Sequence, residues 1–404
     1  MRSWKRNQAA VTAAAFVGFT GFTLVMPFLP LYIRELGVTD VGEIALWTGV
    51  TLGVSPAIAA LTAPLWGRVG DRFGNKLLVQ RSIVSFIVVM SAMAYVTQAW
   101  QLFALRCLQG FFAGYGPLTL SMAARSAPPD KVATAIGTVQ TAQRMGPTVG
   151  PVIGGLLAPM VGLRNAFFVA AGFYAIALVV LTVLYEEPPR ERHESAKRPR
   201  MAFSSILGFE NFLLLMLVVF GLQLVDRSFG PILPLYLGQI GYSEAEVPIA
   251  AGGLFSVLAF TAALGHHLTS RLLKTRSARV VLVAAAVVGA AALTGFAASR
   301  GIAMMAISIG LVGVCIGISM TTAYTAGTAV IPPDVHATAF GFLTGSSLIG
   351  VAISPVLAGL VAARSIRAVF VAGVAMLVIL AVVVRRVMVE RNPEVAPPPA
   401  VEES

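Results

Sequence analysis

The chain has 404 residues, of which 57% are hydrophobic and only 12% are charged, and its mean hydropathy is +0.83. An ordinary soluble protein carries about 25% charged residues, so this composition excludes a soluble globular fold. The formal net charge of +11 would suit a nucleic-acid-binding protein, but the basic residues lie in short segments between long apolar runs, which excludes that function as well.

Apolar runs recur along the whole chain, and each is long enough to cross the hydrocarbon layer as a helix, which takes roughly 18 to 25 residues. The runs lack the strict alternation of a barrel strand. The first run shows no small-residue cleavage site, so we expect a retained helix rather than a secretory signal. We predict twelve transmembrane helices, over residues 9–32, 44–66, 77–96, 100–122, 133–158, 164–184, 209–237, 246–270, 278–298, 301–324, 337–362 and 366–386.

Most of the 29 lysines and arginines fall in segments that share one side of the membrane if the N-terminus is cytoplasmic. The positive-inside rule therefore predicts that both termini are cytoplasmic. The expected location is the inner, cytoplasmic membrane, which the chain crosses many times.

Two short stretches recur at one fixed offset. PFLPLY begins at Pro27 and PILPLY at Pro231 (231 − 27 = 204), while APPDKVATAIG begins at Ala127 and IPPDVHATAFG at Ile331 (331 − 127 = 204). One shared register predicts a duplicated six-helix unit, and an even number of crossings gives both copies the same orientation. We predict an all-α membrane protein of two six-helix bundles related by pseudo-twofold symmetry. Its parts are a bundle over 1–184, a cytoplasmic linker over 185–208, a second bundle over 209–386 and a disordered tail over 387–404.

The segment GRVGDRFGNK follows the second predicted helix. It resembles GxxxDRxGRK, the loop signature of the major facilitator superfamily, although Asn75 stands where a second basic residue is usual. The resemblance implies a loop that latches the cytoplasmic side closed; the alternative is an ordinary positively charged turn. The matching residues are Gly67, Asp71, Arg72, Gly74 and Lys76.

The fifth predicted helix carries GPTVGPVIGG, which resembles the GxxxGPxxGG signature of the twelve-helix drug:proton antiporters in the same superfamily. Glycines at a spacing of four let a neighbouring helix approach closely, and a proline removes one helical hydrogen bond. Generic packing of small residues is the alternative. The residues are Gly146, Gly150, Pro151, Gly154 and Gly155. In the fourth helix, RCLQGFFAG from Arg106 resembles the RxxQG pattern of the family.

Four ionisable residues lie near the middle of predicted spans, where such groups are costly and are functional by default. They are Arg106, Arg144, Asp226 and Arg227. Arginine does not release its proton in a working pH range, so Asp226 is the predicted proton carrier, with the arginines as partners; a static ion pair is the alternative. Three arginines against one aspartate favour anionic, zwitterionic or neutral amphipathic cargo. The predicted pocket lining includes Phe22, Gln109, Tyr115, Gln143 and Gln223.

The remaining chemistry-bearing residues indicate neither catalysis nor a cofactor. Cys107 and Cys315 lie inside predicted helices, and we expect His266 and His267, near a helix end, to be solvated surface. No GxSxG, HExxH or GxxxxGK[ST] motif supports an enzyme or an ATP-driven pump, and no metal site or cofactor is implied.

The predicted function is proton-coupled efflux of small amphipathic molecules, of the multidrug type, by alternating access. The expected partners are a small-molecule substrate, protons and the lipid bilayer, with no nucleic acid, and the expected state is a monomer. Two alternatives remain open. One is a metabolite-specific or uncoupled carrier of organic acids or sugars, and the other is a receptor or scaffold that has lost transport.

Overall fold

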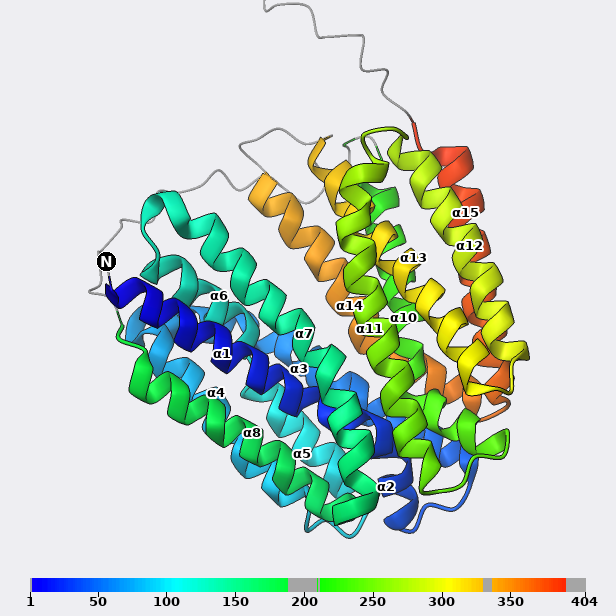
Figure 1. Ribbon diagram of the computed structural model, residues 1–404, viewed down its shortest axis with the longest axis horizontal. Helices are drawn as coiled ribbons and strands as arrows, with labels where there is room; N and C mark the ends of the chain where they lie inside the picture. Colours follow the sequence, from blue (N-terminus) through cyan, green and yellow to red (C-terminus); the bar gives the residue numbers. More distant parts are fainter. Residues whose placement is uncertain (1, 188–208, 210, 330–335, 390–404) are drawn as a thin grey trace, which may run out of the picture.

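The computed structural model describes residues 2–187, 209, 211–329 and 336–389, and all regular elements within these ranges are helices. Most of the predicted linker (185–208) and tail (387–404) lie outside the described residues. The helices form two groups, which converge at the end where α2 lies and diverge toward the end where the N-terminus lies (Figure 1).

Proline and glycine divide two of the predicted first-half helices. The first is divided around Pro27 and Pro30 into α1, the 3₁₀ turn η1 and α2; each proline lacks the N–H that a helical hydrogen bond requires. Gly114, with φ of 124°, separates α5 from α6 within the predicted fourth helix. The elements are α1 (Arg2–Leu24), η1 (Met26–Phe28), α2 (Leu29–Glu35), α3 (Val41–Phe73), α4 (Asn75–Met93), α5 (Ala99–Phe111), α6 (Tyr115–Ser126), η2 (Pro129–Lys131), α7 (Val132–Val161) and α8 (Leu163–Leu184).

The second half consists of six unbroken helices. They are α10 (Phe212–Gln239), α11 (Glu246–Leu272), α12 (Ala278–Ala298), α13 (Ile302–Ala329), α14 (His336–Ala362) and α15 (Ile366–Val387). In the described part of the chain, ten helices are long and apolar enough to cross a membrane. The α5–α6 pair and the glycine-rich α7 complete the predicted twelve.

Matching hydrogen bonds in the two halves bear out the duplication. Tyr32 Oη donates to the carbonyl of Met93 at 2.6 Å, and Tyr236 Oη donates to the carbonyl of Ala297 at 2.8 Å. The two tyrosines are 204 positions apart (236 − 32), and so are the two residues whose carbonyls accept (297 − 93). This is the offset of the repeated sequence. The same tyrosine therefore secures the same turn in each copy.

A second pair of contacts joins the first and last helices of each half. Asn7 Nδ2 donates to the carbonyl of Glu186 at 2.7 Å, and its Oδ1 accepts from the Glu186 backbone N–H at 3.0 Å. Asn211, 204 positions further on, makes the same two bonds with Val389, both at 2.9 Å. We call these pairs the asparagine ties.

Buried apolar side chains form two separate cores. One is built from residues between Ala10 and Tyr185, and the other from residues between Phe212 and Met388 together with Ala45 of α3. The predicted fold class, an all-α membrane protein of two six-helix bundles, is confirmed. The domain boundaries at 184 and 209 stay a prediction.

Candidate functional site: the central cavity

A cavity of about 950 Å³ lies between the two halves. Its walls come from α1, η1 and α7 of the first half and from α10, α11, α13 and α14 of the second. A volume of this size suits a drug-sized molecule, since ligand pockets typically hold about 300–1,000 Å³.

The cavity runs along the helices from a polar mouth to an apolar end. Helices α1, α7, α10 and α14 begin at the face where the two groups diverge (Figure 1), which we call the terminal face. Twelve residues after the start of α7, or about 18 Å along its axis, Arg144 lines the cavity. Met26, Pro151 and Phe255 line the end remote from the terminal face.

Two symmetry-related crossings hold the remote end shut. A Cβ built on Gly252 of α11 would lie only 3.0 Å from the carbonyl carbon of Pro151 in α7, and one on Gly49 of α3 only 2.9 Å from that of Pro355 in α14. Pro151 and Pro355 are equivalent residues (355 − 151 = 204). Only glycine allows backbones to cross this closely, so the two halves are in contact at both crossings.

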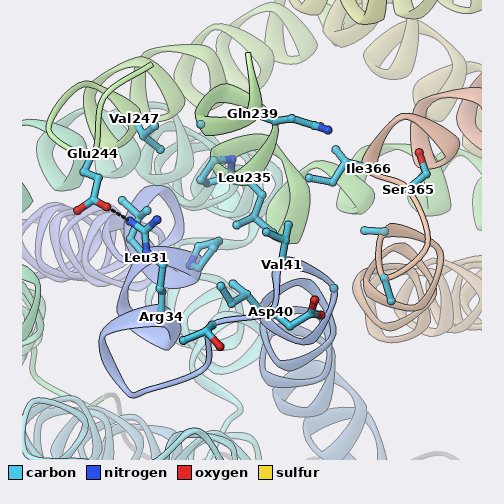
Figure 2. A pocket seen from close by; sticks show the side chains of 18 of the residues that line it. Leu31, Arg34, Asp40, Val41, Leu235, Gln239, Glu244, Val247, Ser365 and Ile366 are labelled. Atoms are coloured by element: carbon cyan, nitrogen blue, oxygen red, sulfur yellow. Dashed lines mark ion pairs between the residues drawn. The ribbon is translucent and has the colours of Figure 1, made fainter. Parts of the chain in front are cut away.

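An ion pair between the halves lies beyond these crossings. Arg34 of α2 points toward Glu244, in the turn between α10 and α11, and Nη2 lies 2.7 Å from Oε1 (Figure 2). Both residues line a smaller cavity of about 550 Å³ that also includes Asp40 and Arg364. This cavity is therefore an outer vestibule on the closed side of the molecule.

The structure brings together three of the four deep ionisable residues that the sequence singled out. Asp226, Arg227 and Arg144 line the central cavity. Asp226 Oδ2 lies 3.1 Å from Nε of Arg227, its neighbour in sequence. Arg106 does not line the cavity: it is 2% exposed, lies inside the first bundle, and donates from Nη1 to Gln109 Oε1 at 2.9 Å.

Of the predicted pocket residues, Phe22, Gln143 and Gln223 line the central cavity. Phe22 and Asp226, which the repeat makes equivalent, thus meet at the same space. Gln109 and Tyr115 are buried within the first bundle instead, where the Tyr115 hydroxyl donates to the carbonyl of Ala14. The sequence therefore did not predict which face of their helices meets the cavity.

His266 lines the cavity, so the prediction that it is solvated surface is wrong. Its Nδ1 lies 2.6 Å from Thr321 Oγ1 of α13. A signal was present in the sequence, because His266 follows Ala262 by four positions and Ala259 by seven, and it therefore lies on the cavity face of α11 with them. The adjacent His267 is exposed, as predicted.

The residues of the predicted gate loop begin inside a helix. Gly67, Asp71 and Arg72 lie in the last turns of α3, which extends to Phe73; their side chains lie outside the described part of the chain. Gly74, with φ of 97°, makes the turn into α4. Lys76 Nζ donates to the carbonyl of Tyr185 at 2.6 Å, a contact within the first half.

The glycines of the fifth-helix motif face two neighbouring helices. A Cβ on Gly146 would lie 2.6 Å from the Phe19 Cβ of α1, and one on Gly150 would lie 2.5 Å from the Thr20 carbonyl oxygen. Gly154 packs against Leu24 of α1, while Gly155 approaches Pro248 of α11 in the other half. The motif therefore packs α7 against its own bundle on one side and across the closed end on the other.

Comparison with known proteins connects this architecture to a family. The sequence profile described as Major Facilitator Superfamily matches residues 11–338 and 215–404. The chain is similar to the multidrug resistance protein MdtG of Proteus mirabilis (strain HI4320), with 35% identity over 256 residues, covering 63% of this chain and 64% of the relative. The match thus spans slightly less than two thirds of that relative. It is also similar to the multi-drug resistance efflux pump PmrA homolog of Lactococcus lactis subsp. lactis (strain IL1403), with 32% identity and 70% coverage of each chain.

Solved structures share the fold at low sequence identity. A bacterial homolog of the human lysosomal transporter Spinster, in an inward-facing and unoccupied conformation, superposes with a TM-score of 0.77 at 18% identity, covering 95% of this chain and 96% of the other. The nucleoside transporter NupG (D323A mutant) follows with a TM-score of 0.71 at 14% identity, covering 93% and 98%. Among the described residues, no group of three or more His, Cys, Asp or Glu could hold a metal ion.

Proposed function

Because the chain belongs to the Major Facilitator Superfamily, we propose that it is a secondary active transporter that exports small amphipathic molecules in exchange for protons. The observation that carries the proposal is a cavity walled by both halves, closed at one end by paired helix crossings and reached from the other. Tilting of the halves about such a cavity would expose it to each side in turn. The names of the two relatives, a multidrug resistance protein and an efflux pump, support efflux of drug-like compounds.

The chain is a multi-pass membrane protein, and we place it in the inner membrane with both termini in the cytoplasm. The excess of basic residues on the segments at the terminal face supports this orientation. The terminal face is then cytoplasmic, and the structure represents an inward-facing state. It would act as a monomer on a small-molecule cargo, by transport rather than catalysis.

Asp226 is the proposed proton carrier. It is the one carboxylate among the described residues that line the cavity, and its side chain is 19% exposed, so protons can reach it from the mouth. A proton on Asp226 removes the charge that pairs with Arg227 Nε. Protonation of Asp226 would therefore free the Arg227 guanidinium to make other contacts in the cavity. The protonated and unprotonated forms would then differ in the contacts they prefer.

The test is transport in everted membrane vesicles energised by a proton gradient. Asp226→Asn should abolish gradient-driven uptake, and Asp226→Glu should keep part of it. Asp40→Asn is a matched control, because Asp40 is an exposed carboxylate in the outer vestibule that accepts a hydrogen bond from the Glu43 backbone N–H at 2.9 Å. Full coupling in Asp226→Asn would remove this residue from the mechanism.

An uncoupled or metabolite-specific carrier is the second candidate. It is favoured by the contact between Asp226 and an arginine on the same helix, which is also what a purely structural pair would make. The two candidates differ in one measurement. Cargo flux in proteoliposomes should depend on an imposed pH difference for the antiporter and be indifferent to it for the uncoupled carrier.

A further inference from the structure

The charges that line the central cavity do not balance. Apart from the phenol of Tyr324, four ionisable side chains line it among the described residues, namely Arg144, Asp226, Arg227 and His266. Asp226 and Arg227 pair with each other, and His266 is hydrogen-bonded to Thr321. Arg144 forms no ion pair with any described residue. With a neutral histidine, the cavity therefore carries one uncompensated positive charge.

That charge has different costs in the two stages of a transport cycle. While the mouth is open, Arg144 is exposed and water solvates its guanidinium. Closure of the mouth around cargo displaces this water, and an unpaired charge in a closed apolar space is strongly unfavourable. A cargo that brings an acidic group removes this cost, whereas a cationic cargo adds to it.

The apolar part of the cavity lies at a defined distance from Arg144. Pro151, at the closed end, follows Arg144 by seven residues on α7, or about 10 Å along the helix axis. Apolar side chains line this deeper region, including Met26, Phe255 and Val351. The separation matches a molecule whose acidic group and apolar body lie at opposite ends of a two-ring skeleton.

We infer that the cavity takes amphipathic molecules with a single acidic group, which the Arg144 guanidinium binds while the apolar body fills the closed end. This inference rests on the proposed transport function and names the cargo class of the same cavity. Arginine suits the task because its planar fork matches the two oxygens of a carboxylate or a phosphate-type group. The same chemistry is offered by a soluble organic acid and by an anionic lipid.

Binding to the purified full-length protein in detergent, without any gradient, tests the inference separately from transport. Three probes share one ring system and differ in charge: naphthaleneacetate, naphthaleneacetamide and naphthylethylammonium. The protein should bind the acetate most tightly and the ammonium most weakly. Arg144→Gln should weaken acetate binding about ten- to hundredfold, the strength of a charge-assisted hydrogen bond, and leave amide binding unchanged.

Two further variants serve as controls. Arg144→Lys retains the charge and should keep part of the preference for the acetate. Arg271→Gln removes an exposed cation on α11 that does not line the cavity, and it should change nothing. Equal binding of the three probes by the unmodified protein, or unchanged acetate binding in Arg144→Gln, would overturn the inference.

Competition by lipid vesicles identifies the source of the acidic group. If phosphatidylglycerol displaces naphthaleneacetate in an Arg144-dependent way and phosphatidylcholine does not, the inference holds with a lipid as cargo. If neither lipid competes while acetate binding depends on Arg144, it holds with a soluble acid. A protein that binds the acetate through Arg144 but drives no flux in vesicles would refute the proposed function and leave this inference intact.

Discussion

Replacing Gly252 with alanine should shift the protein away from the inward-facing state proposed above. A Cβ at this position would lie 3.0 Å from the carbonyl carbon of Pro151 and 3.3 Å from the Cα of Gly155, whereas ordinary contact begins at 3.4 Å. The carbonyl carbon alone requires the two helices to separate by 0.4 Å (3.4 − 3.0), and the Pro151 carbonyl oxygen, which lies closer still, requires more. Both near atoms belong to backbone, so neither can move aside alone.

The size of the shift follows from the cost of overpacking, which is about 1–3 kcal/mol. In the proposed cycle this crossing exists only while the external end is closed, so the cost falls on one state. The ratio of inward- to outward-facing molecules should therefore drop about 5- to 150-fold. Gly49→Ala, at the symmetry-related crossing, should act in the same direction, because its Cβ would lie 2.9 Å from the carbonyl carbon of Pro355.

The ratio of inward- to outward-facing molecules can be followed by double electron–electron resonance, which measures the distance between two spin labels. Thr97→Cys and Arg300→Cys place labels in exposed turns of the two halves, on the external side, in a background without Cys107 and Cys315. Gly252→Ala should increase the long-distance population. The adjacent Gly253→Ala is a matched control, because a Cβ there meets nothing within 4 Å. An unchanged distribution in Gly252→Ala, or an equal change in Gly253→Ala, would refute the reasoning.

Three further outcomes are expected. Glu244→Lys should favour external opening by less than about fivefold, since the ion pair with Arg34 is exposed and exposed ion pairs are weak. The same spin labels should show that high salt reduces this effect. Adding Arg34→Glu, which restores opposite charges, should reverse it. Asn7→Ala should lower the free energy of unfolding by about 1–3 kcal/mol, because it removes two part-buried hydrogen bonds to Glu186 that contribute about 0.5–1.5 kcal/mol each; the loss would be seen as a lower melting temperature. Asn211→Ala should cost less, because both of its hydrogen bonds are exposed to water. A loss in Asn7→Ala no greater than in the control Asn165→Ala, whose amide makes one exposed hydrogen bond, would contradict the expectation.

The sequence predicted the number and order of the helices because the hydrocarbon layer imposes a minimum length on each apolar run. The repeat predicted two equivalent halves because matching residues, such as Tyr32 and Tyr236, make equivalent hydrogen bonds in each half. Neither signal reports how far each helix is rotated about its own axis. The sequence therefore could not show that Arg106 and Gln109 face the interior of the first bundle, since neighbouring helices determine which face meets the cavity.

Local geometry escaped prediction for a related reason. The break at Gly114 depends on a positive φ that glycine permits but does not require. His266 could have been found by following the face of α11 from Phe255, but its proximity to Thr321 of α13 depends on how two helices pack. The partly buried position of Asp226 beside Arg227 likewise required coordinates.

The asparagine ties bear on how force passes through each half. Asn7 fastens the beginning of α1 to the chain just after α8, and Asn211 fastens the beginning of α10 to the chain just after α15. Each half is thus closed on itself at the terminal face, where its first and last helices are joined. A displacement of one of these two helices is passed directly to the other, so the first and last helices of each half should tilt together.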